Sequence, residues 1–456
     1  MMHSLRSTIA QPRSRRRLAR LVAVVWLAAL AGCGGGGGSS GTSASAQCDV
    51  DSQKSWLRDY MLDAYFWSGA SPNPEPAAFD SVQTYFEALR FGGSGAVPAD
   101  RWSYITSSAG FSQFFGEGKT LGYGLFVNGL ELQLPLKVRF IEEKSPAAAQ
   151  GLVRGDVILA INGRMATDIV AANDFSVLNP AKEGDTIVVQ IAAGAGSRSV
   201  TLAATAYTLT PVPAPRVLTL ANGSKAGYVL MKDFISQAEA PLAAAFAGFR
   251  AAGATELILD LRYNGGGLIS TSKLLASLVA GSAHNGKLFT SLSHSAKQSA
   301  RNSSYSFSAT EPGFTRVVVL TGERTCSASE LVVNGLKPYV QVVTVGAQSC
   351  GKPFGFNPTA SCGSTFSAVN FEALNALGEG RYYDGIVTTC AVDEDFNGAL
   401  GDPAEKLTAA AASYLQSGVC PPVAAAAQER ARALSVARRA RGSQPEPGER
   451  RGMWAD

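Results

Sequence analysis

Hydrophobic and polar positions follow different patterns in three successive regions of the chain. In residues 48–67 the apolar side chains recur every three to four positions, which is the period of a helix with one buried face. A second helix is predicted for residues 81–90. These segments predict a small helical domain over residues 48–118.

From residue 119 onwards, short apolar runs alternate with turns that contain glycine. Residues 121–127 read as a glycine-rich turn that leads into a strand, and residues 138–141 and 185–191 read as further strands. Short strands separated by turn residues are typical of β structure. The pattern therefore predicts a β domain over residues 119–206.

Between residues 207 and 422, runs that suit buried strands alternate with helical patterns. The strand-like runs at residues 256–261 and 316–320 are each followed by a helical segment. This alternation implies an α/β domain with a mainly parallel sheet. The polar stretch at residues 281–304 reads as a surface loop.

The net charge of +4 is a property of the two ends of the chain. Residues 1–33 carry six Arg and no acidic residue, and residues 428–456 carry seven Arg and four acidic residues, which leaves about −5 for the rest. An acidic body does not favour a nucleic-acid-binding protein. Residues 423–456 are rich in Ala, Arg and Pro, and we expect a mostly disordered tail, with a short helix over residues 423–440 as an alternative.

The first 33 residues have the features of an export signal. Arginines precede an apolar run at residues 21–31, which is too short to span a bilayer. The run ends in the sequence LAGC, which resembles the lipobox of bacterial lipoproteins and implies acylation of Cys33. An ordinary secretory leader is the alternative. The Gly/Ser-rich residues 34–47 would form a tether, and the lack of an acidic residue after Cys33 resembles the signal for an outer-membrane anchor facing the periplasm.

Six cysteines remain after Cys33, and an even number favours disulfides in an exported chain. Six cysteines allow fifteen pairings, and the sequence alone does not select one. No pair has the Cys-x-x-Cys spacing of common zinc sites, and only His284 and His294 lie outside the leader. We therefore expect no metal ion and no cofactor, and we expect both histidines to be solvated.

Two junctions that follow predicted strands carry candidate chemistry. The first, at residues 260–267, ends in three glycines, which let backbone N–H groups approach a ligand closely. The second contains Ser327 at a predicted helix start. Taken alone, Ser327 fits an N-cap, because Glu330 stands three residues later as in a capping box.

Together, these segments resemble the active-site motifs of the C-terminal processing peptidases, also called tail-specific proteases. In that family the first serine of Ser-Ala-Ser-Glu is the nucleophile, and a lysine one helix and one strand later is the general base. The resemblance assigns these roles to Ser327 and Lys352. The glycine-rich turn resembles the family's Asp-Leu-Arg-x-Asn-x-Gly-Gly, which implies an oxyanion site formed by backbone N–H groups of Ala328 and Gly266, with Gly265 or Gly267 as the alternatives to Gly266. The resemblance also implies a crotonase- or Clp-protease-like α/β peptidase core over residues 207–422.

A Ser–Lys pair suits a chain with so few histidines. A serine hydroxyl needs a base to remove its proton, and a lysine can be that base only if its ammonium pKa is lowered. We therefore expect Lys352 to be buried and to touch no carboxylate; a solvated turn lysine is the alternative. Phe356 stands where many members of the family carry an assisting glutamine. We also hypothesise that a disulfide between Cys326 and Cys350 braces the site.

Residues 119–206 resemble a PDZ domain of the bacterial protease type, because the series SPA, GL, GD and ING occurs in order. The resemblance implies that a peptide's terminal carboxylate is bound by backbone N–H groups of one loop, and that the next strand edge pairs with the peptide. The loop residues are Tyr123, Gly124, Leu125 and Phe126. A β domain used only for packing is the alternative.

The sequence therefore predicts a lipid-anchored serine endopeptidase that uses a Ser–Lys dyad to cleave proteins recognised by their C-terminal tails. Its expected partners are protein or peptide substrates and the membrane that holds its anchor. The alternative is a catalytically inactive lipoprotein scaffold whose PDZ-like domain binds protein C-termini. Under the leading prediction, the PDZ-like domain also keeps the site closed until a tail binds.

Overall fold

The computed structural model of the chain describes residues 48–129, 133–422 and 452–455. The predicted leader, its Cys33, the tether and the alternative helix at residues 423–440 lie outside the described residues. Within the described ranges, no helix has the length and apolar character needed to cross a membrane.

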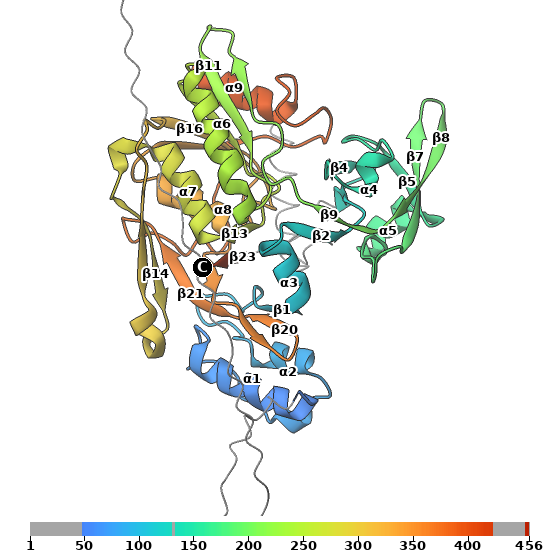
Figure 1. The fold of residues 1–456 in the computed structure, drawn as a ribbon, viewed down its shortest axis with the longest axis vertical. Coiled ribbons are helices and arrows are strands. Elements are labelled where there is room, and N and C mark those ends of the chain that lie inside the picture. The colour runs from blue at the N-terminus through green and yellow to red at the C-terminus, as the bar shows by residue number, and fades with distance from the viewer. Residues whose placement is uncertain (1–47, 130–132, 423–451, 456) are drawn as a thin grey trace, which may run out of the picture. The chain divides into compact units, whose positions relative to one another are not determined.

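A six-stranded sheet forms the centre of the peptidase region (Figure 1). Its strands, in spatial order, are β10 (Arg216–Thr219), β11 (Lys225–Leu230), β12 (Glu256–Asp260), β16 (Arg316–Thr321), β17 (Gln341–Gly346) and β22 (Cys390–Ala391). Only β10 pairs antiparallel with its neighbour, and the other strands pair in parallel. The mainly parallel sheet agrees with the alternation of strands and helices in the sequence.

Helices cover both faces of this sheet. The helices are α6 (Glu239–Ala251), α7 (Ile269–Ala280), α8 (Ala328–Leu336) and α9 (Lys406–Ser417). Successive side chains of β12 point to opposite faces, so Leu257 and Leu259 pack with α6, α7 and α8, while Ile258 packs with α9. The layers confirm the predicted α/β core.

A second six-stranded sheet lies beside the first. In spatial order it contains β13 (Gly266–Leu268), β23 (Gly452–Trp454), β18 (Phe354–Phe356), β21 (Val369–Leu374), β14 (Leu288–His294) and β15 (Ser303–Ser306). The surface loop predicted for residues 281–304 is therefore wrong, since this stretch contains β14 and two short 3₁₀ helices, Ser282–His284 and Ala296–Arg301. His294 is 8% exposed and its Nε2 lies 3.1 Å from Asn357 Nδ2, so the prediction of a solvated side chain is also wrong.

The last described segment is an ordered exception within the predicted, mostly disordered tail. Gly452–Trp454 forms β23 inside the second sheet, and the side chains of Met453 and Trp454 are 0% and 1% exposed. Two large apolar side chains and a strand partner on each side account for the burial of this segment. This exception concerns residues 452–455 only.

The two predicted N-terminal helices form, and a third helix that was not predicted follows them. The helices are α1 (Val50–Ala64), α2 (Val82–Leu89) and α3 (Ser108–Phe115), and each is capped by the side chain of the residue before it. They pack through aromatic side chains on a small sheet, in the order β1 (Tyr104–Ser107), β20 (Ser364–Ser367) and β19 (Thr359–Ser361). Because β20 and β19 belong to the peptidase region, this domain shares a core with it. A disulfide between Cys48 and Cys362 also joins the two.

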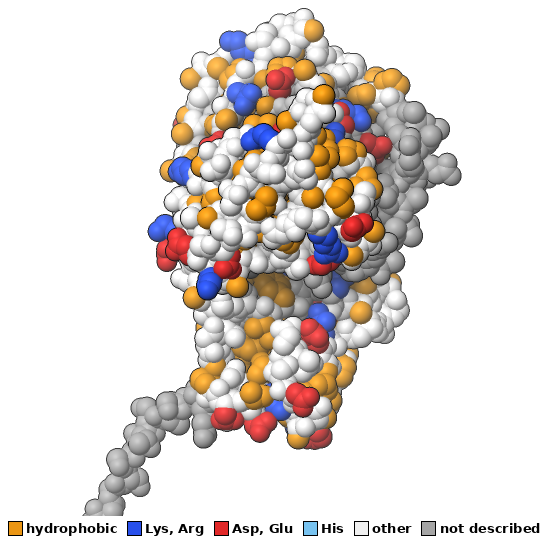
Figure 2. Space-filling model, turned by 90° about the vertical axis from the view of Figure 1, so that its right-hand side faces the viewer, with side chains coloured by type: hydrophobic (Ala, Val, Ile, Leu, Met, Phe, Trp, Pro, Cys, Tyr) orange, Lys and Arg blue, Asp and Glu red, His pale blue; other side chains and the backbone are white. Residues whose placement is uncertain are grey.

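The PDZ-like region consists of short strands and helices around its own apolar core. Its elements are β2 (Lys119–Gly122), β3 (Leu125–Val127), β4 (Val138–Ile141), α4 (Pro146–Ala149), β5 (Ile158–Ile161), β6 (Arg164–Met165), α5 (Ala166–Ala172), β7 (Thr186–Ala193), β8 (Gly196–Ala203) and β9 (Thr205–Thr208). On the face shown in Figure 2, Lys and Arg side chains are scattered among Asp and Glu and form no single basic patch. This surface gives no support to nucleic-acid binding.

Candidate active site

Ser327 lies in a tight turn between β16 and α8. Its backbone has φ +58° and ψ −110°, a region that a residue with a side chain rarely adopts and that costs about 1–3 kcal/mol. The side chain is fully buried, and its Oγ has no hydrogen-bond partner among the described residues. Ser327 and Glu330 are placed as in a capping box. The Glu330 carboxylate accepts the backbone N–H of Ser327, but the Ser327 hydroxyl makes no hydrogen bond in return. A strained, buried and unengaged hydroxyl is unusual for a helix cap and suits a nucleophile.

Glu330 connects the two segments that carry the candidate dyad. Its Oε2 accepts the N–H groups of Ser327 at 2.9 Å and of Lys352 at 2.8 Å. Its Oε1 accepts the N–H of Gly351 at 2.8 Å and the hydroxyl of Ser349 at 2.5 Å. Burial raises the pKa of the Glu330 carboxyl, and these four hydrogen bonds act in the opposite direction. Glu330 therefore fixes the position of Ser327 relative to Lys352.

Lys352 follows β17 and directly precedes β18. The residue is 1% exposed, so the expected burial agrees with the structure, and the solvated alternative is wrong. Its Nζ lies 3.7 Å from the ring centroid of Phe356, a cation–π contact. The sequence marked Phe356 only as the residue that replaces a glutamine, and its contact with the ammonium group was not predicted.

The predicted oxyanion groups lie next to each other although Gly266 and Ala328 are far apart in the sequence. Gly266 has φ +112°, and a Cβ added to it would lie 3.1 Å from the backbone N of Ala328. The Gly266 N–H is already used, because it donates to Oδ1 of Asn264 at 2.8 Å. Ala328 is therefore the better placed donor, and Gly266 would have to share or leave its bond to Asn264 to stabilise an oxyanion.

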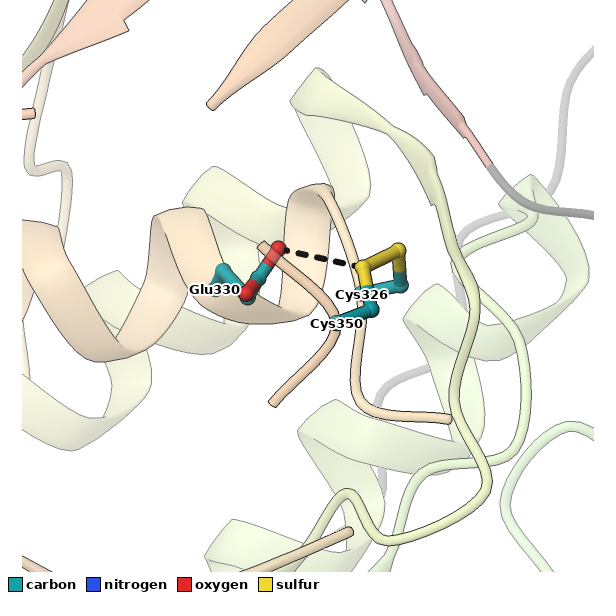
Figure 3. Close-up of side chains that lie close together, drawn as sticks. All are labelled: Cys326, Glu330 and Cys350. Carbon is teal, nitrogen blue, oxygen red and sulfur yellow. Dashed lines mark hydrogen bonds between the residues drawn. A yellow bond between two sulfur atoms is a disulfide. The ribbon is translucent and has the colours of Figure 1, made fainter. Parts of the chain in front are cut away.

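A disulfide joins Cys326 and Cys350, as hypothesised, and links the residues directly before Ser327 and two before Lys352 (Figure 3). Figure 3 also shows the 3.5 Å approach of Cys350 Sγ to Glu330 Oε2. Cys326, Cys350 and Glu330 are close enough together to suggest a metal site. Sulfurs in a disulfide are not thiolates, so this cluster does not offer metal ligands of the usual kind. A further disulfide joins Cys390, in β22, to Cys420.

A buried ionic network adjoins the glycine-rich turn. Arg262 donates to Glu405 at 2.7 and 3.0 Å and to Glu394 at 3.0 Å, and Arg154 of the PDZ-like region also donates to Glu394, at 2.6 Å. Burial alone would raise the pKa of Glu405, but Arg262 and Thr408 lower it to about 2. A cavity of about 70 Å³ is lined by residues of this network but not by Ser327 or Lys352. The network connects the PDZ-like region to the turn that carries Gly266.

The proposed carboxylate loop of the PDZ-like region is rigidly held. Gly124 has φ +69°, and a Cβ there would lie 2.0 Å from Cβ of Ser145, so a side chain does not fit. The Tyr123 carbonyl accepts the N–H of Ala147, and the side chains of Tyr123, Leu125 and Phe126 are buried. Strand β3 pairs with β4 on one side, and no described strand pairs with its other side. Peptide binding at this edge stays a prediction.

Comparisons with known proteins agree with this architecture. Residues 225–370 match the family model "Peptidase family S41", residues 52–104 match the S41 N-terminal domain, and residues 113–192 match the PDZ domain. These matches define a serine-type peptidase core preceded by a PDZ domain. The chain is therefore similar in domain content to S41 peptidases, and its similar proteins include carboxyl-terminal-processing proteases.

Two of these relatives show how far the similarity extends. The carboxyl-terminal-processing protease of Picosynechococcus sp. is 27% identical over 241 residues, which is 52% of this chain and 55% of the relative. The chloroplastic carboxyl-terminal-processing peptidase 1 of Arabidopsis thaliana is 28% identical over 222 residues, 48% of this chain and 44% of the relative. The chain thus spans about half the length of the curated relatives it matches.

Solved structures show the same fold. A putative S41 protease from Bacteroides fragilis superposes with a TM-score of 0.63 at 23% identity, covering 80% of this chain and 98% of that one. The photosystem II D1 C-terminal processing protease gives a TM-score of 0.50 at 18% identity, covering 75% and 93%. At these identities the comparison supports the fold and not the activity.

Proposed function

We propose that this protein is a serine endopeptidase in which Ser327 is the nucleophile and Lys352 the general base, and that it acts on proteins recognised by their C-terminal tails. The observation that carries the proposal is Glu330. One buried carboxylate holds the backbone of both residues, at 2.9 and 2.8 Å, in a turn where Ser327 is strained. A merely structural cap has no need to bind the loop of a buried lysine as well.

The proposed reaction follows from these groups. Lys352 Nζ takes the proton of Ser327 as its Oγ attacks the scissile carbonyl, and the Ala328 N–H stabilises the charge on the oxygen. Ser327 Oγ and Lys352 Nζ are not hydrogen-bonded to each other here. Such bonds are often loose before substrate binds, so Nζ would swing from the Phe356 ring toward the hydroxyl.

The PDZ-like domain would deliver the tail and control access. Its Arg154 shares Glu394 with Arg262, so a peptide that shifts this domain would also act on the glycine-rich turn. Cys33 would carry a lipid anchor that holds the enzyme on the outer membrane, facing the periplasm. If deletion of residues 119–206 changes the basal rate of peptide cleavage in neither direction, this control is absent.

The test uses residues 34–456, without the predicted leader, and an unfolded protein with an apolar C-terminus. Wild type should cleave it, and Ser327→Ala and Lys352→Ala should each lose at least about 10³-fold in kcat. Val419→Ala, at a side chain that is 66% exposed, is the control and should cleave normally. Binding of the tail without cleavage by wild type would instead support the inactive scaffold, and cleavage that survives both substitutions would exclude the dyad.

A further inference from the structure

The strand β23 occupies a position that a bound peptide would take. It lies between β13, which contains Gly266, and β18, which follows Lys352, and it runs parallel to both. The N–H of Gly452 donates to the Gly265 carbonyl at 3.1 Å, and the N–H of Ala455 donates to the Phe356 carbonyl at 3.2 Å. Addition of a strand between existing edges is a common way to bind an extended peptide.

The carbonyl group of Gly452 lies beside Gly266, on the side where the Ala328 N–H group is also close. The point where a Cβ of Gly266 would stand is 2.0 Å from the Gly452 oxygen, 3.0 Å from its carbonyl carbon and 3.1 Å from the Ala328 N. The three groups therefore surround one point beside the Gly266 Cα. Among the bonds of this segment, the one from Gly452 to Met453 is the bond whose carbonyl lies there.

The side chains of the segment fill pockets of the peptidase. The Trp454 ring lies 4.4 Å from Phe115, 6.0 Å from Phe356 and 6.1 Å from Phe111, centroid to centroid. Its Nε1 has no hydrogen-bond partner in the described part of the chain, so the pocket recognises an apolar aromatic ring and not an indole N–H. A side chain on Gly452 would meet the Trp454 ring at 2.2 Å, so the bound conformation requires glycine there.

We propose that this segment is bound as a substrate and that the site cleaves its own chain between Gly452 and Met453. The inference rests on the function proposed above and names a first substrate for it. Until cleavage, the segment blocks the groove against other peptides. The preferred peptide is then one with glycine before the cleaved bond and a ring such as Phe or Trp two positions after it.

The step uses only groups already placed. Ser327 Oγ loses its proton to Lys352 and forms a bond to the Gly452 carbonyl carbon. The bond from that carbon to the Met453 nitrogen breaks, and the nitrogen takes the proton from the Lys352 ammonium. Water then attacks the ester and the bond to Ser327 Oγ breaks. One proton of the water passes to Ser327 Oγ, the other is released, and a carboxylate remains on Gly452.

The first experiment follows the intact mass of residues 34–456, as wild type and as Ser327→Ala. Wild type should lose residues 453–456 and end at Gly452, at a first-order rate that does not depend on protein concentration, while Ser327→Ala keeps its full mass. Wild type that cleaves an added protein but keeps its own segment overturns this inference and leaves the proposed function standing. Failure to cleave either one overturns both. Cleavage at another bond overturns the assignment of the bond between Gly452 and Met453. A rate that rises with protein concentration overturns the reaction within one chain.

Three substitutions test how the segment is recognised. Trp454→Phe should be cleaved within about twofold of wild type, and Trp454→Ala at least about tenfold more slowly, because a large buried ring is lost. Gly452→Val should block self-cleavage but still allow cleavage of an added peptide, which shows that the variant folds. Equal self-cleavage by Gly452→Val and wild type would contradict the proposed binding.

The inactive variant Ser327→Ala tests whether the segment blocks the groove. A fluorescent peptide with the sequence of residues 450–456 should bind Ser327→Ala that ends at Arg451. It should bind full-length Ser327→Ala at least about tenfold more weakly. Equal binding to both proteins would show that the segment does not block the groove.

Discussion

Two buried carboxylates near the same turn have opposite surroundings. Glu405 is paired with the guanidinium of Arg262, which holds its pKa at about 2. Glu330 accepts three backbone N–H groups and one hydroxyl, and burial raises its pKa. The first arrangement neutralises charge and fixes a domain contact. The second holds the segments of Ser327 and Lys352 through neutral donors. The difference separates an ion network between domains from the support of the proposed dyad.

Among the substitutions that probe this comparison, the largest effect is expected from Glu330→Ala. Three buried N–H groups and a hydroxyl would lose their acceptor, which should lower the free energy of unfolding by about 4 kcal/mol and kcat by about 100-fold. Urea unfolding and a peptide-cleavage assay below the melting temperature measure the two effects. Glu256→Ala, which removes a half-buried partner of Arg316, is the control and should keep kcat. Unchanged kcat in folded Glu330→Ala would show that Glu330 does not position the dyad.

Glu405→Gln should mainly reduce stability. A carboxyl with a pKa of about 2, against about 4.5 when unfolded, contributes about 3 kcal/mol above pH 4.5, and this contribution is lost as the pH falls from 4.5 toward 2. Wild type should therefore lose stability on acidification over that range, and the variant should lose less. The comparison fails if the free energy of unfolding has the same pH dependence in both proteins.

Removal of disulfides should separate stability from activity. Cys326→Ser with Cys350→Ser should cost about 2–3 kcal/mol of unfolding free energy and lower kcat by about tenfold, since the bridge joins the segments of Ser327 and Lys352. Cys390→Ser with Cys420→Ser, which opens a loop of similar length, is the matched control, with a comparable loss of stability and normal kcat. Equal losses of kcat in the two double variants would show that the Cys326–Cys350 disulfide does not hold the segments of Ser327 and Lys352 in place.

The smallest effect is expected from Phe356→Leu, which removes the ring under the Lys352 ammonium. The ring packs against the Lys352 side chain, with Nζ 3.7 Å from its centroid, so its loss should leave the lysine less well positioned and lower kcat on an added peptide about threefold to tenfold. Phe356→Tyr keeps the ring and should stay within about twofold of wild type. Equal activity of the leucine and tyrosine variants would show that the ring does not support the lysine.

Much of this architecture could be predicted from local pattern. The strand–helix alternation predicts the parallel sheet, because buried β12 and β16 are continuous apolar runs. Ser327 and Lys352 were found because each lies in a short motif after a predictable strand. The helical N-terminal domain follows from one amphipathic pattern.

The rest depends on contacts between residues that are distant in sequence. Nothing near Glu330 indicates that its carboxylate binds the amides of Gly351 and Lys352, about twenty residues later. β23 was missed because three residues after an Arg-rich stretch carry no strand periodicity, and only β13 and β18 make Gly452–Trp454 a strand. β14 was missed because serines, threonine and histidine interrupt its apolar alternation.

The most direct test of the central claim is labelling with a serine-reactive fluorophosphonate, followed by peptide mapping. The chain of residues 34–451 is used, so that β23 cannot protect the site. We expect one adduct, on Ser327, formed at least about 100-fold more slowly in Lys352→Ala. An adduct at another residue, or equal labelling with and without Lys352, would contradict a Ser327–Lys352 dyad.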